Sequence, residues 1–373
     1  MATATHDLQQ HTPTDIPTTM RAAVYRGIND IRVETVPVPK IGAGEVLIRV
    51  HACGVCGTDL KKIHTGSHSA PRIFGHETAG IIAAVGAGVR DFSVGDRVIV
   101  YHHTPCGECY YCRKKTFAQC PLYKRVGCTA GFEPSGGGFA EYVRVMDWIV
   151  RRGLIKIPDG VPFEQAAFVE PVNTVLKGVR RLDLAADETV LVIGQGPIGI
   201  LLATLSARTG AKVLTSDLYP ERHAIASHYG LHHPINAGKE DVVAAAHAAS
   251  EGRGADAVIL AVGGNGLIRT AMDAARPGGR ILLFAQTQHG EATFDPAVVC
   301  MDEKTLLGSY SSSFEMEPDV EELVFGGYSK GFDLTRLISH RFPLEEAVEA
   351  IRVASNPGAA SMKIFVYPST AQV

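Results

Sequence analysis

The amino-acid sequence predicts an α/β protein in which an N-terminal, β-rich domain is followed by a doubly wound parallel sheet. Three observations lead to this prediction. Between residues 172 and 312, short apolar runs alternate with helix-like stretches, which is the pattern of βαβ units. Before residue 171 the chain holds short apolar runs, many glycines and few long helical periods. A glycine-rich turn joins strand-like to helix-like sequence near residue 194.

The first part of the chain is expected to form a compact, mostly antiparallel barrel. Four short apolar segments between turn signals are its predicted strands, at residues 22–25, 45–52, 79–85 and 96–101. A helical pattern over residues 170–184 then leads into the second domain.

The second part is expected to form the parallel sheet, with strands at residues 189–193, 212–216, 255–262, 279–285 and 305–310, and a weaker one at 233–236. Two helices, at 317–324 and 344–355, and a last strand at 363–366 are expected to return to the first domain. The predicted division is therefore a flexible tail over residues 1–19, a first domain over 20–171 and 313–373, and a second domain over 172–312.

Composition excludes several classes of protein. The chain has 373 residues, 46% of them hydrophobic, and a net charge of −3, so no basic surface for nucleic acid or membrane is expected. No apolar run approaches the roughly 20 residues of a membrane-spanning helix. The first 19 residues lack the apolar segment of a signal peptide, and eight cysteines without an export signal favour metal sites or free thiols. A reducing, cytoplasmic setting is expected.

The glycine-rich turn has the form that binds a dinucleotide. An apolar run at 189–193 leads into Gly194-Gln195-Gly196-Pro197-Ile198-Gly199, and a helical pattern follows. Gly194 permits the tight turn, Gly196 lets the backbone approach a pyrophosphate, and Gly199 lets helix and strand pack closely. The helix N-terminus presents free N–H groups to the phosphates. A plain glycine turn is the alternative, but the strand before and the helix after it favour the dinucleotide site.

Asp217 ends the next predicted strand and is expected to accept both hydroxyls of the adenosine ribose. It would repel a 2′-phosphate, so the sequence predicts NAD in preference to NADP. Arg222 is accordingly expected to stack over the adenine. Pro197, Ile198 and Val262 complete the predicted cofactor site, and Lys363 is either a ligand of the pyrophosphate or a solvated lysine.

Four closely spaced cysteines predict a structural zinc site, with the pattern Cys106-x2-Cys109-x2-Cys112-x7-Cys120. Four thiolates can close a tetrahedron around one zinc ion and leave no position for substrate. An iron–sulfur cluster is the main alternative, and a redox Cys-x-x-Cys pair is a weaker one because the motif is repeated.

A second, dispersed set of metal-binding residues lies in Cys56-Gly57-Thr58-Asp59, Gly75-His76-Glu77 and Glu170-Pro171. Cysteine, histidine and carboxylate are a plausible three-ligand set for a zinc ion with one open position. Spacing alone leaves a structural role for these residues equally open.

These motifs, together with Val94-Gly95-Asp96-Arg97-Val98, occur in the order found in zinc-dependent medium-chain dehydrogenases, and the resemblance covers about residues 20–368. Glu170-Pro171 is similar to the polyol and threonine dehydrogenase branch. The resemblance implies a GroES-like catalytic domain and a Rossmann cofactor domain. It implies a catalytic zinc held by Cys56 and His76, with Glu170 as a further ligand or the holder of the metal's water, Glu77 as a carboxylate that can enter the shell, and Thr58 as the proton acceptor.

Two departures from the resemblance leave the substrate open. Lys61 stands where relatives commonly carry a relay histidine, and is expected either to act as a base or to point to water. Tyr310 and Ser311 stand where sorbitol dehydrogenases have Phe-Arg, which argues against sorbitol itself. His103 stands where relatives line the substrate pocket, and is expected either to line that pocket or to have a surface or packing role.

The resulting expectation is an oxidoreductase that uses zinc and NAD to oxidise a secondary alcohol of a polyol, cyclitol or amino alcohol. An L-threonine 3-dehydrogenase-like enzyme is the first alternative, and a non-enzymatic NAD-binding protein is a distant one. A homodimer or homotetramer is expected. Cys53, Cys128 and Cys300 are expected to be ordinary buried thiols that bind no metal.

Overall fold

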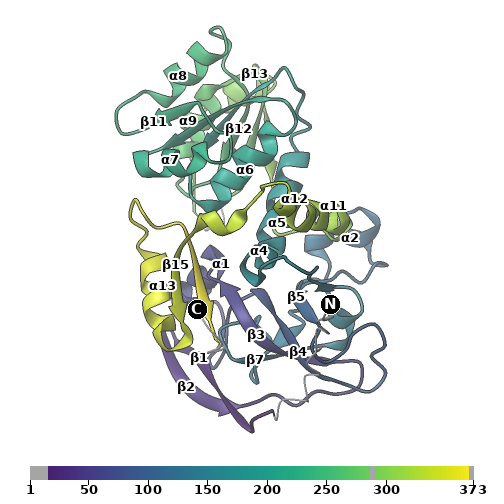
Figure 1. Cartoon of the computed structure of the whole chain (residues 1–373). Coiled ribbons are helices and arrows are strands. Elements are labelled where there is room, and N and C mark those ends of the chain that lie inside the picture. Colours follow the sequence, from purple (N-terminus) through teal and green to yellow (C-terminus); the bar gives the residue numbers. More distant parts are fainter. Residues whose placement is uncertain (1–15, 286–289, 369–373) are drawn as a thin grey trace, which may run out of the picture.

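The chain folds into two lobes that meet at a helical junction (Figure 1). The structure is a computed structural model that describes residues 16–285 and 290–368. One lobe holds a parallel sheet and its helices. The other holds the N-terminal strands and the last strands of the chain, which return to it as expected (Figure 1). Residues 1–15, most of the predicted tail, lie outside the described residues.

The parallel sheet contains β9 (Thr189–Ile193), β10 (Lys212–Asp217), β11 (Pro234–Asn236), β12 (Ala255–Leu260), β13 (Ala275–Leu283) and β14 (Thr305–Gly308). Its strand order is β11-β10-β9-β12-β13-β14, the doubly wound order of dinucleotide-binding domains. Every residue of β9 is buried, as expected for a parallel strand with helices on both faces. Because the winding direction changes between β9 and β12, a ligand-binding crevice is expected at their carboxyl ends.

Five helices accompany this sheet: α6 (Pro197–Ala207), α7 (Pro220–Ser227), α8 (Val242–Ala249), α9 (Gly266–Ala274) and α10 (Pro296–Cys300). The first of them follows the glycine-rich turn and is almost entirely apolar. It is buried from Gly199 to Ser206, because it lies between the sheet and the junction of the lobes.

The other lobe is an eight-stranded, mostly antiparallel sheet, paired in the order β15-β16-β3-β4-β5-β8, with β7 on β3 and β6 on β7. The strands β1 and β2 form a separate hairpin. The bounds are β1 (Thr19–Gly27), β2 (Asp30–Pro37), β3 (Val46–Gly54), β4 (Glu77–Val85), β5 (Arg97–Val100), β6 (Cys128–Thr129), β7 (Tyr142–Val145), β8 (Leu154–Lys156), β15 (Ile338–Pro343) and β16 (Lys363–Tyr367).

The remaining helices border this lobe and the junction. They are α1 (Gly57–Thr65), α2 (Tyr110–Arg113), α3 (Asp147–Val150), α4 (Phe163–Ala167), α5 (Val169–Arg180), α11 (Glu317–Glu321), α12 (Gly327–Ser329) and α13 (Ala347–Ser355). Single helical turns occur at Phe117–Gln119, Phe314–Met316, Leu334–Leu337 and Leu344–Glu346, and a π-helical turn spans Glu322–Gly326.

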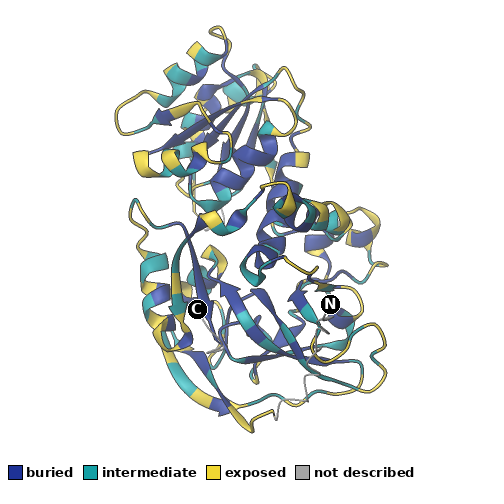
Figure 2. Ribbon diagram, viewed as in Figure 1, coloured by how far each residue is buried: buried dark blue, intermediate teal, exposed yellow. Residues whose placement is uncertain are grey.

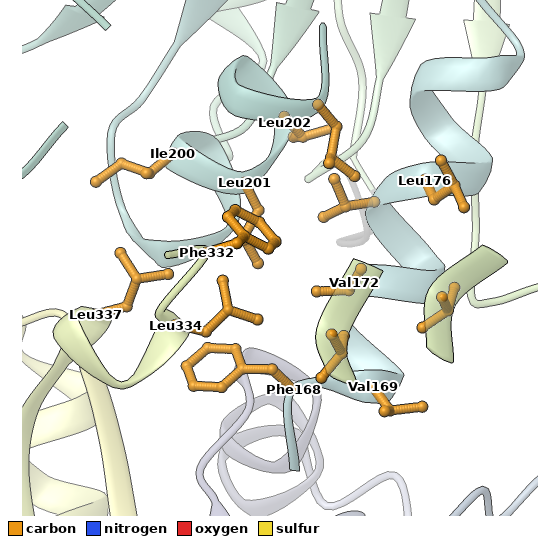
Figure 3. Packing of buried hydrophobic residues seen from close by; sticks show 14 of the residues in the cluster. Phe168, Val169, Val172, Leu176, Ile200, Leu201, Leu202, Phe332, Leu334 and Leu337 are labelled. Carbon is orange, nitrogen blue, oxygen red and sulfur yellow. The ribbon is translucent and has the colours of Figure 1, made fainter. Parts of the chain in front are cut away.

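One apolar core runs through the junction and ties the lobes together. Phe168, which links α4 to α5, and Val172 and Leu176 of α5 belong to one cluster with Leu201 of α6 and Phe332 (Figure 3). In Figure 2 most of α5 and α6 is drawn as buried ribbon. The shared core fixes the position of α5 against both sheets, and this helix carries Glu170.

The predicted fold class is confirmed, and several expected details are wrong. The helix expected over 170–184 ends at Arg180, because Asp183 adopts a left-handed backbone (φ +49°). The strand expected over 255–262 ends at Leu260, and the helix expected over 317–324 breaks into an α-turn and a π-turn. Cys300 was expected to be buried but is exposed, because it ends α10 at the surface.

Candidate active site

Two of the predicted metal motifs meet at one end of the antiparallel sheet. Cys56 caps the N-terminus of α1, while His76 precedes β4 and Glu77 begins it. Because β3 and β4 pair with Gly54 opposite Glu77, the end of one strand lies beside the start of the other. One ligand atom from each of the three side chains lies within 4.8 Å of the other two. Thiolate, imidazole and carboxylate at this separation fit a zinc ion and leave one coordination position open.

Asp59 holds this cluster in place, a role that sequence analysis missed. Its Oδ1 atom lies 3.0 Å from Nδ1 of His76, and its Oδ2 atom accepts a 3.2 Å hydrogen bond from the Cys56 backbone. Burial raises the pKa of Asp59, but the interaction with His76 outweighs burial and lowers it. A carboxylate on Nδ1 leaves Nε2 free for a metal. The sequence could have indicated this role, because Asp59 is the third residue of a helix that Cys56 caps, where an acidic side chain commonly accepts from the backbone of the capping residue.

Lys363 lies beside the cluster at the start of β16. Its ammonium group donates to Oε1 of Glu77 at 2.6 Å and to the carbonyl of Val55 at 3.0 Å. Burial acts to lower the pKa of Lys363, but the charges of Glu77 and Cys56 raise it by more. The charged lysine offsets part of the negative charge that Cys56 and Glu77 bring into a buried site. The alternative of a solvated Lys363 is wrong, because its exposed fraction is 6%.

Glu170 and Thr58 lie next to the cluster but are not among its three clustered ligands. Glu170 is in the first turn of α5 and accepts a 3.4 Å hydrogen bond from the hydroxyl of Thr174. Burial raises the pKa of Glu170, and the charges of His76 and Glu77 act on it as well. The exposed Thr58 donates its backbone N–H to the sulfur of Cys56 at 3.5 Å.

A series of ring contacts connects the cluster with the segment that follows β14. His76 contacts His102 with ring centroids 5.0 Å apart, His102 contacts His103 at 4.0 Å, and His103 stacks on Tyr123 at 5.0 Å. The Tyr123 hydroxyl lies 2.8 Å from Oγ of Ser311. Burial lowers the pKa of His103 to about 3, so this ring is neutral. Sequence analysis missed His102 and Tyr123, because their contacts join segments that are distant in the chain.

The four cysteines of the second motif converge around α2. The sulfur of Cys112 lies 3.5 Å from that of Cys109 and 3.8 Å from that of Cys106, and the sulfurs of Cys120 and Cys106 lie 3.6 Å apart. A tetrahedron of thiolates about 2.3 Å from a zinc ion has edges of about 3.8 Å. The arrangement therefore fits one zinc ion and is too tight for a cluster of several iron atoms.

The glycine-rich turn has the geometry that a dinucleotide needs. Gly194 has φ +98°, which only glycine adopts readily. A Cβ atom on Gly199 would lie 1.8 Å from the carbonyl oxygen of Gly194, so the helix could not pack on the strand. A Cβ atom on Gly196 would meet no protein atom within 4 Å, and it would fill the space a pyrophosphate occupies. Val262 lies just beyond β12, facing Gly194.

Asp217 lies at the end of β10 and is fixed by backbone groups. Its carboxylate accepts hydrogen bonds from the N–H groups of Gln195 (2.7 Å) and Tyr219 (3.0 Å). Arg222 reaches this carboxylate at 3.4 Å and also donates to the Gly358 carbonyl at 3.2 Å. Its guanidinium group lies 4.9 Å from the centroid of the Tyr219 ring. The arginine is thus held at the edge of the turn.

One cavity of about 250 Å³ joins the metal cluster to the glycine-rich turn. Its lining includes Cys56 and Glu77 from one lobe, Gly196, Pro197, Ile198 and Arg222 from the other, and Lys363. A second cavity, of about 480 Å³, is lined in part by Lys61 and Tyr310. The prediction that His103 and Ser311 line the substrate pocket is not met by this cavity: neither residue lines it, and both contact Tyr123 instead.

Fold and site together define a class of protein. A doubly wound domain with a dinucleotide turn, a β-rich domain with a Cys-His-Glu cluster and a four-cysteine lobe make a zinc- and nicotinamide-dependent dehydrogenase.

Comparison with known proteins gives the family. The chain belongs to the zinc-type medium-chain alcohol dehydrogenases, in the polyol and threonine dehydrogenase branch. Residues 42–159 match the alcohol dehydrogenase GroES-like domain, and residues 197–325 match the zinc-binding dehydrogenase domain. The protein is therefore an oxidoreductase whose cofactors are zinc and a nicotinamide dinucleotide.

Several relatives are similar over nearly their whole length. Sorbitol dehydrogenase of Bacillus subtilis is 29% identical, over 95% of this chain and 99% of its own. L-threonine 3-dehydrogenase of Rhizobium rhizogenes is 31% identical, over 89% of this chain and 95% of its own. A zinc-binding dehydrogenase structure from Sinorhizobium meliloti, bound to NADP, is 30% identical with a TM-score of 0.83, over 94% of this chain and 100% of that one.

Within the described residues, no helix has the length and apolar character needed to cross a membrane.

Proposed function

We propose that this enzyme oxidises a secondary alcohol of a small polar substrate to a ketone, with transfer of hydride to NAD. The observation that carries this proposal is the cavity that joins the metal cluster to the dinucleotide turn. A substrate bound at the cluster would face a nicotinamide bound from the other lobe. The similarity to sorbitol and threonine dehydrogenases supports a polyol, a cyclitol or an amino alcohol as substrate.

In the proposed reaction, Cys56, His76 and Glu77 would hold the zinc ion, and Asp59 orients His76. Zinc, when bound, supplies a Lewis acid that makes the substrate hydroxyl a better proton donor. Thr58 accepts that proton, and the carbinol carbon gives its hydrogen as hydride to the nicotinamide. The products are the ketone, the reduced cofactor and one proton. From Thr58 the proton continues through a ribose hydroxyl to solvent, or through Lys61.

Glu170 is proposed as a further carboxylate of the metal site. Glu170 is close enough to His76 and Glu77 for their charges to act on its pKa, which supports this role. Cys106, Cys109, Cys112 and Cys120 are proposed to hold a second, structural zinc ion.

NAD is proposed over NADP because of Asp217. Its carboxylate lies at the end of β10, where an adenosine ribose binds in this fold, and it would meet a 2′-phosphate with like charge. A similar structure is bound to NADP, so the preference of this enzyme for NAD over NADP has to be measured directly. Gly194, Gly196, Gly199, Pro197, Ile198, Val262, Arg222 and Lys363 complete the proposed cofactor site.

An L-threonine 3-dehydrogenase-like activity is the second candidate, favoured by the 31% identity with that relative. We further propose that residues 20–171 and 313–373 form the catalytic domain, that residues 172–312 form the NAD domain, and that the enzyme is a cytoplasmic homodimer or homotetramer.

A substrate panel tests the proposal. Polyols, inositols, amino alcohols and L-threonine are supplied with NAD or NADP, and formation of the reduced cofactor is followed by absorbance. The expected result is oxidation of a polyol or cyclitol with a higher kcat/KM for NAD, and a smaller preference in Asp217→Ala. Turnover only with amino acids selects the threonine alternative, and a higher kcat/KM with NADP contradicts the role of Asp217.

A further inference from the structure

The cavity of about 480 Å³ has an unusual charge. Four basic side chains line it, Lys61, Lys115, Lys177 and Arg181, and no lining residue is acidic. These side chains come from α1, from the cysteine lobe and from α5, so the fold gathers them from three separate segments. Like charges gathered in a concave space attract an anion.

For Lys115, Lys177 and Arg181, the described residues supply no buried acidic partner. Lys115 pairs with Glu315 at 3.2 Å, but this pair is exposed on both sides. Lys177 donates to a neutral group, the carbonyl of Tyr310, at 2.7 Å. In the described part of the chain Arg181 has no acidic partner. Burial, and to a smaller extent the charge of Arg181, lower the pKa of Lys177 to about 8.

A second observation also points to a ligand. Ser309 lines the cavity with an exposed fraction of 8%, and its buried hydroxyl has no hydrogen-bond partner among the described residues. Buried hydroxyl groups are usually hydrogen-bonded, so this one is available to an oxygen atom of a bound molecule.

The cavity lies next to the proposed reaction centre. Lys61 is one helical turn beyond Thr58 on α1. Lys177 is two turns beyond Glu170 on α5, so Glu170 beside the metal cluster and Lys177 in the cavity are separated by roughly 10 Å along one helix. A substrate whose hydroxyl group is bound at the metal cluster could therefore place its opposite end in this cavity.

We propose that this cavity binds an anionic group of the substrate, a phosphate ester or a carboxylate, so that the enzyme prefers acidic derivatives of polyols to neutral polyols. The proposal rests on the proposed function and names the substrate class of the same site. Arg181 and Lys177 contact the anion, Lys61 and Lys115 contribute charge at the rim, and the hydroxyl of Ser309 donates to an anion oxygen.

The experiment compares kcat/KM of the zinc-loaded enzyme for D-sorbitol, D-sorbitol 6-phosphate and D-gluconate with NAD. The expected result is a kcat/KM roughly 10-fold or more higher for one of the acidic compounds, the scale of a charge-assisted hydrogen bond. The compound that gains identifies the anion. Arg181→Gln should reduce the ratio of acidic to neutral kcat/KM by roughly 10-fold. Arg253→Gln is the matched control, because Arg253 is exposed and precedes the amino end of β12, at the opposite edge of the sheet.

Equal kcat/KM for neutral and acidic compounds, unchanged in Arg181→Gln, would overturn the proposal while leaving alcohol oxidation intact. Oxidation of none of the compounds would instead count against the proposed function. In that case calorimetric titration with inorganic phosphate decides: binding that weakens in Arg181→Gln and not in Arg253→Gln supports the anion site, and no binding to the wild type overturns it.

Discussion

Asp59 fixes the position of the metal cluster, because its carboxylate contacts His76, the Cys56 backbone N–H and the Gly75 backbone N–H. It touches neither substrate nor cofactor and is therefore a positioning residue. Asp59→Asn keeps the shape and the capping oxygen but removes the charge that orients His76. We expect zinc affinity at the cluster to fall 10- to 100-fold.

Competition with a chelator measures that affinity, and the melting temperature of the zinc-depleted protein serves as the control. A purely structural role would lower the melting temperature of the zinc-depleted variant and leave its zinc affinity unchanged. That result would remove Asp59 from the metal site.

Thr58 carries the proposed proton transfer. Thr58→Ser keeps the hydroxyl and should keep kcat, whereas Thr58→Val removes it and should lower kcat by roughly 10² or more, the scale of a general acid–base group. Steady-state kinetics on the three proteins at equal zinc content makes the comparison. A Thr58→Val enzyme with wild-type kcat would exclude this route for the proton.

Sequence analysis named the residues of the cluster but not their surroundings. Cys56, His76 and Glu77 stand in local motifs, and the resemblance of those motifs to zinc-dependent dehydrogenases, rather than their spacing, assigned them to a metal. Lys363 reaches Glu77 across 286 positions, and Tyr123 reaches Ser311 across 188. Contacts of that kind depend on how the last strands return to the first lobe, which local patterns do not encode.

At the scale of elements, the four-cysteine lobe has little apolar core of its own apart from Phe117, Ala118 and Tyr123, so the metal should supply much of its stability. Cys109→Ser should remove one zinc ion per chain and lower Tm by roughly 5 °C or more. Cys300→Ser is the matched control, because this cysteine is exposed and outside both clusters. Zinc analysis and calorimetry give the result, and unchanged zinc with unchanged melting would contradict the assignment.

The helix α11 contains a carboxyl group that titrates near neutrality. Burial, and then the charge of Glu321, raise the pKa of Glu317 from 4.5 to about 8. The native state therefore binds the proton more tightly than the unfolded chain, and stability is lost as pH rises from 4.5 to 8. Glu317→Gln avoids that loss. Its stability advantage over wild type should be near zero below pH 4.5 and reach on the order of 2–5 kcal/mol above pH 8.

Urea unfolding across this pH range measures the difference. Glu322→Gln is the control, since this neighbouring carboxylate is exposed and paired with Lys330. An advantage of Glu317→Gln that does not change with pH would contradict the raised pKa.

The existence of strands and helices with strong periodicity was predicted well, but their end points were predicted well only where a clear turn bounds them. The strand Thr189–Ile193 matches the prediction at both ends, because a glycine turn bounds it. The strand β13 begins at Ala275, four residues before its expected start, although Pro277 and Gly278 signal a turn. Pairing with β12 extends that strand, and pairing is a property of the sheet and not of the local sequence.

At the scale of the whole molecule, the shared core at α5 and α6 holds the metal cluster of one lobe against the dinucleotide turn of the other. The two metal sites have different places in this arrangement. Cys56 and Glu77 of the Cys-His-Glu cluster line the cavity that contains the glycine turn, while the four cysteines are not among the residues that line it. Two zinc ions with separate functions are therefore expected in each chain.

Zinc content measured beside NAD-dependent alcohol oxidation tests this expectation most directly. We expect two zinc ions per wild-type chain, and one in Cys56→Ala, which should stay folded and lose oxidation. One zinc ion per wild-type chain, held at the four cysteines, or full oxidation by Cys56→Ala, would contradict it.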